Sequence, residues 1–195
     1  MLKDASKVWE IILASKSPRR NELLKNLGIH FKVILREVDE RFPSQLSNAE
    51  VANYISQKKA SVFNINTEKQ MVITGDTIVC KNQKVIGKPK DKEEAFEMIK
   101  SLSGEVHQVI SSYTIKTKDQ EITKSDQVNV FFEPLSEEEI KYYISNYSCL
   151  DKAGAYGIQD WIGQIGVQKI EGSFYTVMGM PIHLLYADLK AILLE

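Results

Sequence analysis

The sequence has few cysteines, no long apolar run and almost no excess charge. Its 2 cysteines in 195 residues are too few for a disulfide framework or a cysteine-based metal site. No apolar stretch reaches the length of a membrane-spanning helix, and the first residues lack a signal-peptide pattern. These absences predict a cytoplasmic protein in a reducing compartment, with no membrane partner.

The net charge of the chain is −1 at pH 7. Proteins that bind nucleic acids over a broad surface normally carry a basic surplus, so no nucleic-acid partner is expected. Hydrophobic residues at 43% and charged residues at 26% are ordinary for a globular protein. A basic cluster in a nearly neutral chain therefore indicates a small anionic ligand.

Two common catalytic motifs are also absent. The sequence contains no Gly-x-Ser-x-Gly nucleophile motif and no Walker-type phosphate loop. Nothing therefore requires a covalent intermediate, and metal-assisted hydrolysis is the simpler hypothesis for an enzyme that binds phosphate.

A basic motif does follow the first apolar run. Residues 11–14 are typical of a strand, and Ser15-Lys16-Ser17-Pro18-Arg19-Arg20 comes directly after them. Leucines at helical spacing follow, and proline suits the first turn of a helix. Hydroxyls, backbone N–H groups and guanidinium groups then meet at a helix N-terminus, which favours an anion. The alternative is a capped helix with two surface arginines.

Asp76 stands between two apolar runs, at residues 71–73 and 78–80. Burying a carboxylate without a partner is costly, and unusual carboxylates often mark functional sites. Gly75 and Thr77 on either side suit a place where a ligand approaches the backbone closely. We therefore favour a functional role for Asp76 over a structural one.

The remaining patterns predict an α/β fold with a mixed sheet, because hairpins occur together with strand–helix alternation. Asn48 is expected to cap the second helix, and His107 is expected to be a structural hydrogen-bonding residue. Strands are predicted over residues 31–35, 71–80, 85–86, 107–116, 121–132 and 165–170, and helices over 18–27, 48–63, 91–102, 136–144 and 181–192.

A nucleotide polyphosphate at the basic motif needs cations for its oxygens and carboxylates for a divalent metal. Mg²⁺ prefers oxygen ligands and often uses one or two carboxylates plus substrate phosphates. Of Lys58 and Lys59, which share one predicted helix, one is expected to face solvent and the other the motif. The chain offers Ser15, Arg19, Arg20, Lys59 and Lys88 for phosphate, and Glu40 and Asp76 for metal and water.

Together these motifs resemble the Maf family of nucleoside triphosphate pyrophosphatases. No single motif is specific, but their ordered set is, and it covers nearly the whole chain. The resemblance rests on Ile12-Leu13-Ala14-Ser15-x-Ser17-Pro18-Arg19-Arg20, Val38-Asp39-Glu40, Lys59-Ala60, Gly75-Asp76-Thr77-Ile78-Val79, Gly87-Lys88-Pro89, Leu102-Ser103-Gly104-x-x-His107-x-Val109 and Asp151-Lys152-Ala153-Gly154-Ala155-Tyr156-Gly157-Ile158-Gln159. Two further motifs extend the match, Ile170-Glu171-Gly172-Ser173 and Val177-x-Gly179-x-Pro181.

The resemblance implies one Maf-like domain over residues 1–195, with an inosine-triphosphatase-like architecture. A long, curved mixed sheet would separate two lobes around a central cleft that takes the nucleotide. It also implies hydrolysis between the α- and β-phosphates, giving a nucleoside monophosphate and pyrophosphate, with Mg²⁺ or Mn²⁺ as cofactor. Dimers occur among related proteins, so a homodimer is compatible with the resemblance.

The resemblance also implies roles for individual residues. Asp76 matches the family's proton acceptor, and it shares the expected metal site with Glu40. Lys59 and Lys88 match further catalytic positions at the phosphates. Positions for substrate binding are matched by Ser15, Arg19, Arg20, Thr77 and Gln159.

The segment Tyr156-Gly157-Ile158-Gln159 is similar to the subfamily that acts on dTTP and UTP. A glutamine amide offers a donor and an acceptor to the O4/N3–H edge of uracil or thymine, although it can also pair with other bases. The expected activity is the clearing of dTTP, UTP and modified pyrimidine nucleotides from the pool. The alternatives are a pyrophosphatase for 7-methyl-GTP or another modified purine nucleotide, and a non-catalytic regulator of septum formation. Trp161 departs from the smaller residues common in the family and adds bulk near the expected base pocket.

Overall fold

Strands and helices alternate along residues 2–194, the part of the chain that the computed structural model describes. The chain divides into two compact units, of which unit 1 comprises Met1–Asp76, Ser111–Asp126 and Gly179–Glu195. Unit 2 comprises Thr77–Ile110 and Gln127–Met178. Three long strands, β3 (Gln70–Lys81), β5 (Val106–Lys116) and β6 (Glu121–Phe132), contribute residues to both units.

The strands form one mixed sheet in the order β2-β1-β3-β5-β6-β7, with β4 paired to β3. In unit 1, β1 (Glu10–Leu13) runs parallel to β2 (Lys32–Val33) and to β3, with Leu13 opposite Ile73. In unit 2, β4 (Lys84–Ile86) returns antiparallel to β3, and β7 (Val167–Glu171) runs antiparallel to β6. The predicted α/β fold with a mixed sheet is confirmed.

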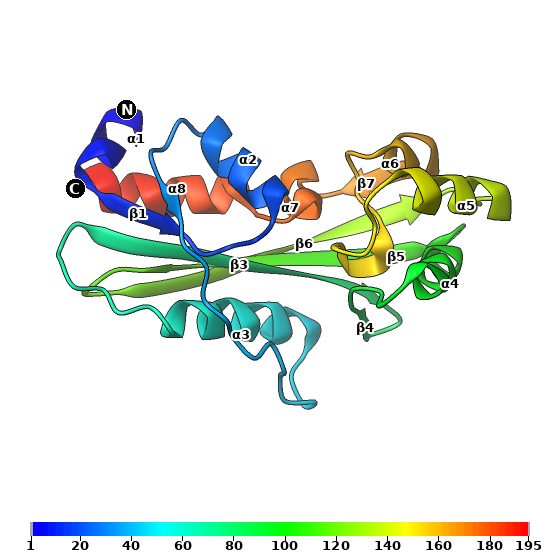
Figure 1. Ribbon diagram of the computed structural model, residues 1–195, viewed down its shortest axis with the longest axis horizontal. Coiled ribbons are helices and arrows are strands. Elements are labelled where there is room, and N and C mark those ends of the chain that lie inside the picture. The colour runs from blue at the N-terminus through cyan, green and yellow to red at the C-terminus, as the bar shows by residue number, and fades with distance from the viewer. Residues whose placement is uncertain (1, 195) are drawn as a thin grey trace. The chain divides into compact units, whose positions relative to one another are not determined.

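Helices cover both faces of the strands in unit 1 (Figure 1). Helix α3 (Asn48–Ser61) lies on one face, and α1 (Leu2–Ala5), α2 (Pro18–Asn26) and α8 (Ile182–Leu194) lie on the other. Neighbouring residues of β5 show this alternation: the Ser112 hydroxyl donates to the Ala52 carbonyl of α3, whereas Tyr113 donates to Asp188 of α8. A short 3₁₀ helix, η1 (Ser6–Val8), precedes β1.

Unit 2 carries the remaining helices, and α4 (Lys92–Leu102) packs against α5 (Glu137–Asn146). The side chain of Asp91 accepts a hydrogen bond from the Glu94 N–H at the start of α4. Ser136 and Glu139 form a capping box at the start of α5. The other elements of this unit are η2 (Ala153–Ala155), α6 (Trp161–Gly166) and α7 (Phe174–Met178).

Two sequence-based expectations about elements are wrong. The predicted strand at 165–170 begins only at Val167, because residues 161–166 form helix α6. A short apolar run does not distinguish helix from strand, and Asp160 stands at the N-cap position of this helix. Ser47, not Asn48, caps α3, since Ser47 forms a capping box with Glu50.

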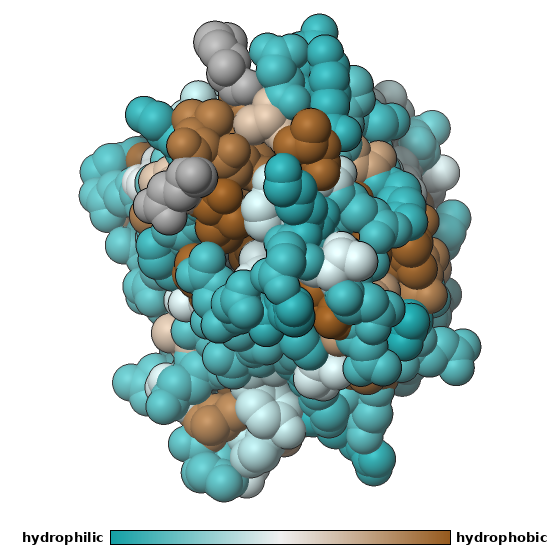
Figure 2. All heavy atoms as spheres, turned by 90° about the vertical axis from the view of Figure 1, so that its left-hand side faces the viewer, coloured by the Kyte–Doolittle hydropathy of each residue, from teal (hydrophilic) through white to brown (hydrophobic). Residues whose placement is uncertain are grey.

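The surface is mostly polar on the side that carries the two termini in Figure 1. Figure 2 shows hydrophilic residues over most of this side, with apolar residues gathered in separate patches. Exposed apolar residues are ordinary on globular proteins. Within residues 2–194, no helix combines the length and apolar character that crossing a bilayer requires.

Candidate active site

The sheet register brings the two main motifs of unit 1 onto neighbouring strands. β1 ends at Leu13, which lies opposite Ile73 of β3, and the Ala14 N–H donates to the Ile73 carbonyl over 2.9 Å. Ser15 therefore follows the carboxyl end of β1, while Asp76 lies within β3, three residues beyond Ile73.

The basic motif forms a capped helix start, as predicted. Ser17 is the N-cap of α2, and its hydroxyl accepts from the Arg20 N–H. The Ser15 hydroxyl accepts from the Ser17 N–H over 3.2 Å and from Arg20 Nη1 over 3.4 Å. Arg19 is half-buried in the same turn. The motif thus carries guanidinium groups and hydroxyls at the positive end of a helix.

Arg20 is not a surface arginine, because it lies against β3 and the segment before α8. Its Nε donates to the Gly179 carbonyl over 2.9 Å. A Cβ atom on Gly75 would lie 2.9 Å from the Ser112 carbonyl oxygen and 3.4 Å from Arg20 Nε, so this approach requires glycine. Burial lowers the pKa of Arg20, while the negative charge of Asp76 acts in the opposite direction.

Lys59 joins the two predicted carboxylates of unit 1. Its Nζ lies 2.8 Å from Asp76 Oδ1 and 3.1 Å from Glu40 Oε1. The register of α3 on β3 explains this contact, because the Thr74 hydroxyl donates to the Ser56 carbonyl over 2.7 Å. Lys59 is one helical turn beyond Ser56, and Asp76 is on the same strand face as Thr74.

The sequence neighbours of Lys59 and Glu40 have other partners. The side chain of Lys58 donates to the Arg41 carbonyl. The Arg41 guanidinium contacts both oxygens of Asp39 and lowers the pKa of that carboxyl to about 2. Glu40 is therefore the member of the acidic turn that faces Lys59, and its side chain remains half exposed, at 51%.

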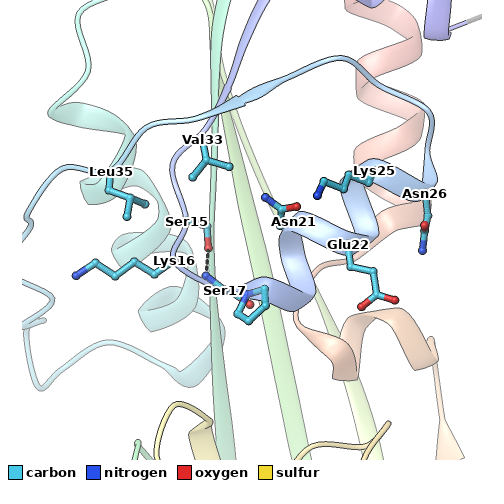
Figure 3. A pocket seen from close by; sticks show the side chains of 10 residues that line it. Ser15, Lys16, Ser17, Asn21, Glu22, Lys25, Asn26, Val33 and Leu35 are labelled. Atoms are coloured by element: carbon cyan, nitrogen blue, oxygen red, sulfur yellow. Dashed lines mark hydrogen bonds between the residues drawn. The ribbon is translucent and has the colours of Figure 1, made fainter.

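A pocket of about 580 Å³ opens beside the basic motif in unit 1 (Figure 3). Its size is typical of a small-molecule site. Asn21 and Lys25 of α2 form one wall, while Val33 and Leu35 form the apolar side. Among residues 2–194, the predicted site residue that lines it is Ser15. The pocket is thus lined by residues 15–18 of the motif but not by the Glu40–Lys59–Asp76 cluster.

Unit 2 contains the other three predicted site residues. Thr77 is half-buried on β3, whereas Lys88 and Gln159 are exposed. The Gly154 N–H donates to the Gly87 carbonyl over 3.0 Å, which ties the segment before Gln159 to the segment of Lys88. A Cβ on Gly154 would lie 3.1 Å from Val79 of β3, so the same loop also packs closely on the sheet.

His107 has the structural role that we expected. It is 1% exposed, and its Nε2 lies 2.7 Å from the Tyr156 hydroxyl. Its ring also meets Phe132 and Tyr156 edge to face. Burial, assisted by the charge of Lys81, lowers the pKa of His107 to about 4, so the ring is neutral near pH 7.

Sequence reasoning missed the polar contacts that hold the Gln159 segment. The Tyr143 hydroxyl of α5 donates to Asp160 Oδ2 over 2.8 Å and accepts from the Gly157 N–H over 3.1 Å. Lys152 is 6% exposed, and its Nζ lies 3.6 Å from the same Asp160 oxygen. The one sequence feature that could have indicated these contacts is Lys152, which stands in a largely apolar segment interrupted by glycines. The Trp161 ring packs edge to face on Tyr142, 4.8 Å away.

The donor chemistry of unit 1 fits a divalent cation. Glu40 and Asp76 both contact one ammonium group, so their oxygens already converge on a positive charge. Two carboxylates plus phosphate oxygens form a typical Mg²⁺ ligand set. Within residues 2–194, no group of three or more histidine, cysteine, aspartate or glutamate side chains is arranged to hold a metal alone. A cation here would therefore complete its coordination with water or with phosphate oxygens of a substrate.

Comparisons with known proteins agree on one family. The family described as "Maf-like protein" matches residues 10–192. A protein of Bacteroides thetaiotaomicron named dTTP/UTP pyrophosphatase is 48% identical over 184 residues, covering 93% of this chain and 95% of that protein. A protein of Christiangramia forsetii with the same name is 46% identical over 194 residues, covering 99% of both chains.

The fold also has a counterpart among solved structures. The Staphylococcus aureus Ham1 protein superposes with a TM-score of 0.51, covering 93% of this chain and 98% of that one. The sequence identity is 18%, so this likeness concerns the fold alone. It supports the predicted inosine-triphosphatase-like architecture.

Proposed function

Since this chain belongs to the Maf family, we propose that it is a nucleoside triphosphate pyrophosphatase that hydrolyses dTTP and UTP. The substrate follows from the name shared by its relatives, dTTP/UTP pyrophosphatase. The single observation that carries the chemistry is the convergence of Glu40 and Asp76 on the Lys59 ammonium group. A non-catalytic nucleotide binder has no need for two acids held in this way. The scarcity of cysteines supports a cytoplasmic location for this activity.

The proposed reaction is attack of water on the α-phosphorus. A new bond forms between the water oxygen and this phosphorus, and the α–β phosphoanhydride bond breaks. Asp76 accepts the proton of the water, and pyrophosphate leaves with the bonding electron pair. The products are a nucleoside monophosphate and pyrophosphate. General-base catalysis of this kind contributes about 10²- to 10⁴-fold to the rate.

The other residues are assigned by their chemistry. Arg20, Arg19 and Ser15 bind phosphate oxygens at the start of α2, and Lys59 and Lys88 add ammonium groups. Thr77 and Gln159 contribute to the recognition of the nucleotide. Glu40 and Asp76 would hold Mg²⁺ or Mn²⁺ together with phosphate oxygens. Such an ion neutralises charge on the phosphates and lowers the pKa of a bound water.

A nucleotide panel tests the proposed function. Purified protein with Mg²⁺ or Mn²⁺ is expected to release pyrophosphate from dTTP, UTP, 5-methyl-UTP and pseudo-UTP, and to leave the monophosphate. EDTA is expected to abolish the release, because it removes the cation that would neutralise charge on the phosphates and lower the pKa of the bound water. Preference for 7-methyl-GTP would replace the substrate assignment. Binding without turnover of any nucleotide would leave the regulator as the better hypothesis.

Replacing Gln159 tests the source of base preference. Gln159→Ala is expected to reduce the preference for UTP over CTP by about tenfold or more, because a two-bond amide contact with a base contributes about 1–3 kcal/mol. The value of kcat for UTP should fall much less, since the ribose separates the base, which the amide would contact, from the α-phosphate. The measurement is kcat/KM for each nucleotide.

Gln164→Ala is the matched control for this change. Gln164 is exposed on α6, five residues beyond Gln159. Its replacement is expected to leave the UTP/CTP preference unchanged. An unaltered preference in Gln159→Ala would remove Gln159 from base recognition.

A further inference from the structure

We propose that Tyr143 is a positioning residue for base selection, which acts by fixing the turn on which Gln159 stands. The inference rests on the base-recognition role proposed for Gln159. Tyr143 belongs to α5 and is fully buried, and its hydroxyl contacts the segment that carries Gln159. It has no role in the proposed hydrolysis.

The Tyr143 hydroxyl uses both of its hydrogen-bonding capacities on this segment. It donates to Asp160 Oδ2 over 2.8 Å and accepts from the Gly157 N–H over 3.1 Å. The Asp160 N–H donates in turn to the Gly157 carbonyl over 3.0 Å, which closes a four-residue turn. Gln159 is the third residue of this turn, so one hydroxyl holds the chain on both of its sides.

Close packing leaves this backbone little freedom. A Cβ on Gly157 would lie 2.5 Å from Asp160 Oδ2 and 2.9 Å from Lys152 Cε. A Cβ on Gly163 of α6 would lie only 2.0 Å from the Ile158 carbonyl oxygen. The observed backbone on both sides of Gln159 therefore requires glycine at positions 157 and 163. The Gln159 side chain is nevertheless exposed, so it is available to a ligand while its backbone is held.

Charge pairing completes the arrangement. Lys152, with only 8% of its side chain exposed, faces Asp160 and also contacts Asp151 and the Ser148 carbonyl. Burial and the hydrogen bond to Asp160 raise the pKa of Tyr143. Tyr143 is therefore protonated at neutral pH and remains the donor to Asp160. A residue that recognises a base by hydrogen bonds needs such support, because small displacements lose directional contacts.

Tyr143→Phe tests the proposal, because it removes the hydroxyl and keeps the ring. The UTP/CTP ratio of kcat/KM is expected to fall about tenfold, close to the effect of Gln159→Ala. In a Gln159→Ala background, Tyr143→Phe is expected to change the ratio less than twofold, since it acts through Gln159. A purely structural role would lower the Tm and leave the ratio unchanged.

Tyr113→Phe is the matched control. Tyr113 is also fully buried, and its hydroxyl donates to a carboxylate, that of Asp188, within unit 1. It should lower the Tm while preserving the UTP/CTP ratio. If Tyr143→Phe folds poorly, the pair Asp160→Asn and Asp160→Ala provides a second test. The asparagine amide retains an oxygen that can accept from Tyr143, so Asp160→Asn should keep most of the UTP/CTP ratio that Asp160→Ala loses.

The outcomes separate this inference from the proposed function. A wild-type protein that neither hydrolyses nor selectively binds any nucleotide overturns both. An active wild type overturns only the inference if Tyr143→Phe keeps the ratio. The inference also fails if the effects of Tyr143→Phe and Gln159→Ala on the ratio simply add.

Discussion

Asp76→Asn is expected to reduce pyrophosphate release from UTP by about 10²- to 10⁴-fold, because an amide cannot accept the proton of the attacking water. The amide is close to the carboxylate in shape and keeps an oxygen that can accept from Lys59 Nζ, now 2.8 Å from Asp76 Oδ1. Binding of a non-hydrolysable UTP analogue should therefore change by less than about tenfold. Steady-state kinetics and calorimetric titration measure the two effects separately.

Asp188→Asn is the matched control for this substitution. Asp188 is another buried carboxylate of unit 1, 9% exposed, and Lys124 contacts it as Lys59 contacts Asp76. Its replacement should lower the Tm, by roughly 2–4 °C for each kcal/mol lost, and leave the rate near that of the wild type. A nearly full rate in Asp76→Asn would remove Asp76 as the base.

Lys59→Met is expected to lower both the rate and the stability. The thioether fills much of the same space, but it removes the ammonium group that contacts Glu40 and Asp76. The rate should fall at least about 10²-fold, because a positioned charge at the phosphates is lost. The free energy of unfolding should fall by up to about 3 kcal/mol, since the mostly buried Asp76 carboxylate loses its partner.

A double variant separates the two effects of Lys59→Met. Adding Asp76→Asn neutralises the unpaired carboxylate, so part of the lost stability should return while the activity stays low. Lys124→Met, which removes a lysine from the buried Asp188, should cost stability alone. A fully active Lys59→Met variant would exclude Lys59 from the site. A double variant no more stable than the single one would contradict the buried-charge explanation.

Local patterns predicted most of the secondary structure. Caps, turns and alternation depend on residues near each other in the chain, so Asp91 and Ser136 indicate helix starts correctly. The error at residues 165–166 arose because a short apolar run does not distinguish a helix from a strand. Asp160 stands at the N-cap position of α6, and Gly163 of this helix lies close to the Ile158 backbone.

The site could be predicted as a set of residue types but not as a set of contacts. Sequence motifs indicated Glu40, Lys59 and Asp76, although the helical pattern alone left open whether Lys58 or Lys59 is the inward lysine. The docking of α3 on β3 decides between them, because Ser56 meets Thr74 and thereby directs Lys59 to Asp76. Tyr143 carried no signal in the sequence, since an inward tyrosine on a helix is typical of an ordinary core.

By itself, the sequence determined the family, the α/β class and the inventory of charged and polar groups, because motifs and periodicities are local properties of the chain. The tertiary structure alone decided which of these groups meet: Arg20 with Gly179, Lys59 with two acids, and Tyr143 with the two ends of a turn. Such contacts join residues far apart in the chain. They depend on strand register and on how each helix packs against the sheet, which the whole core determines together.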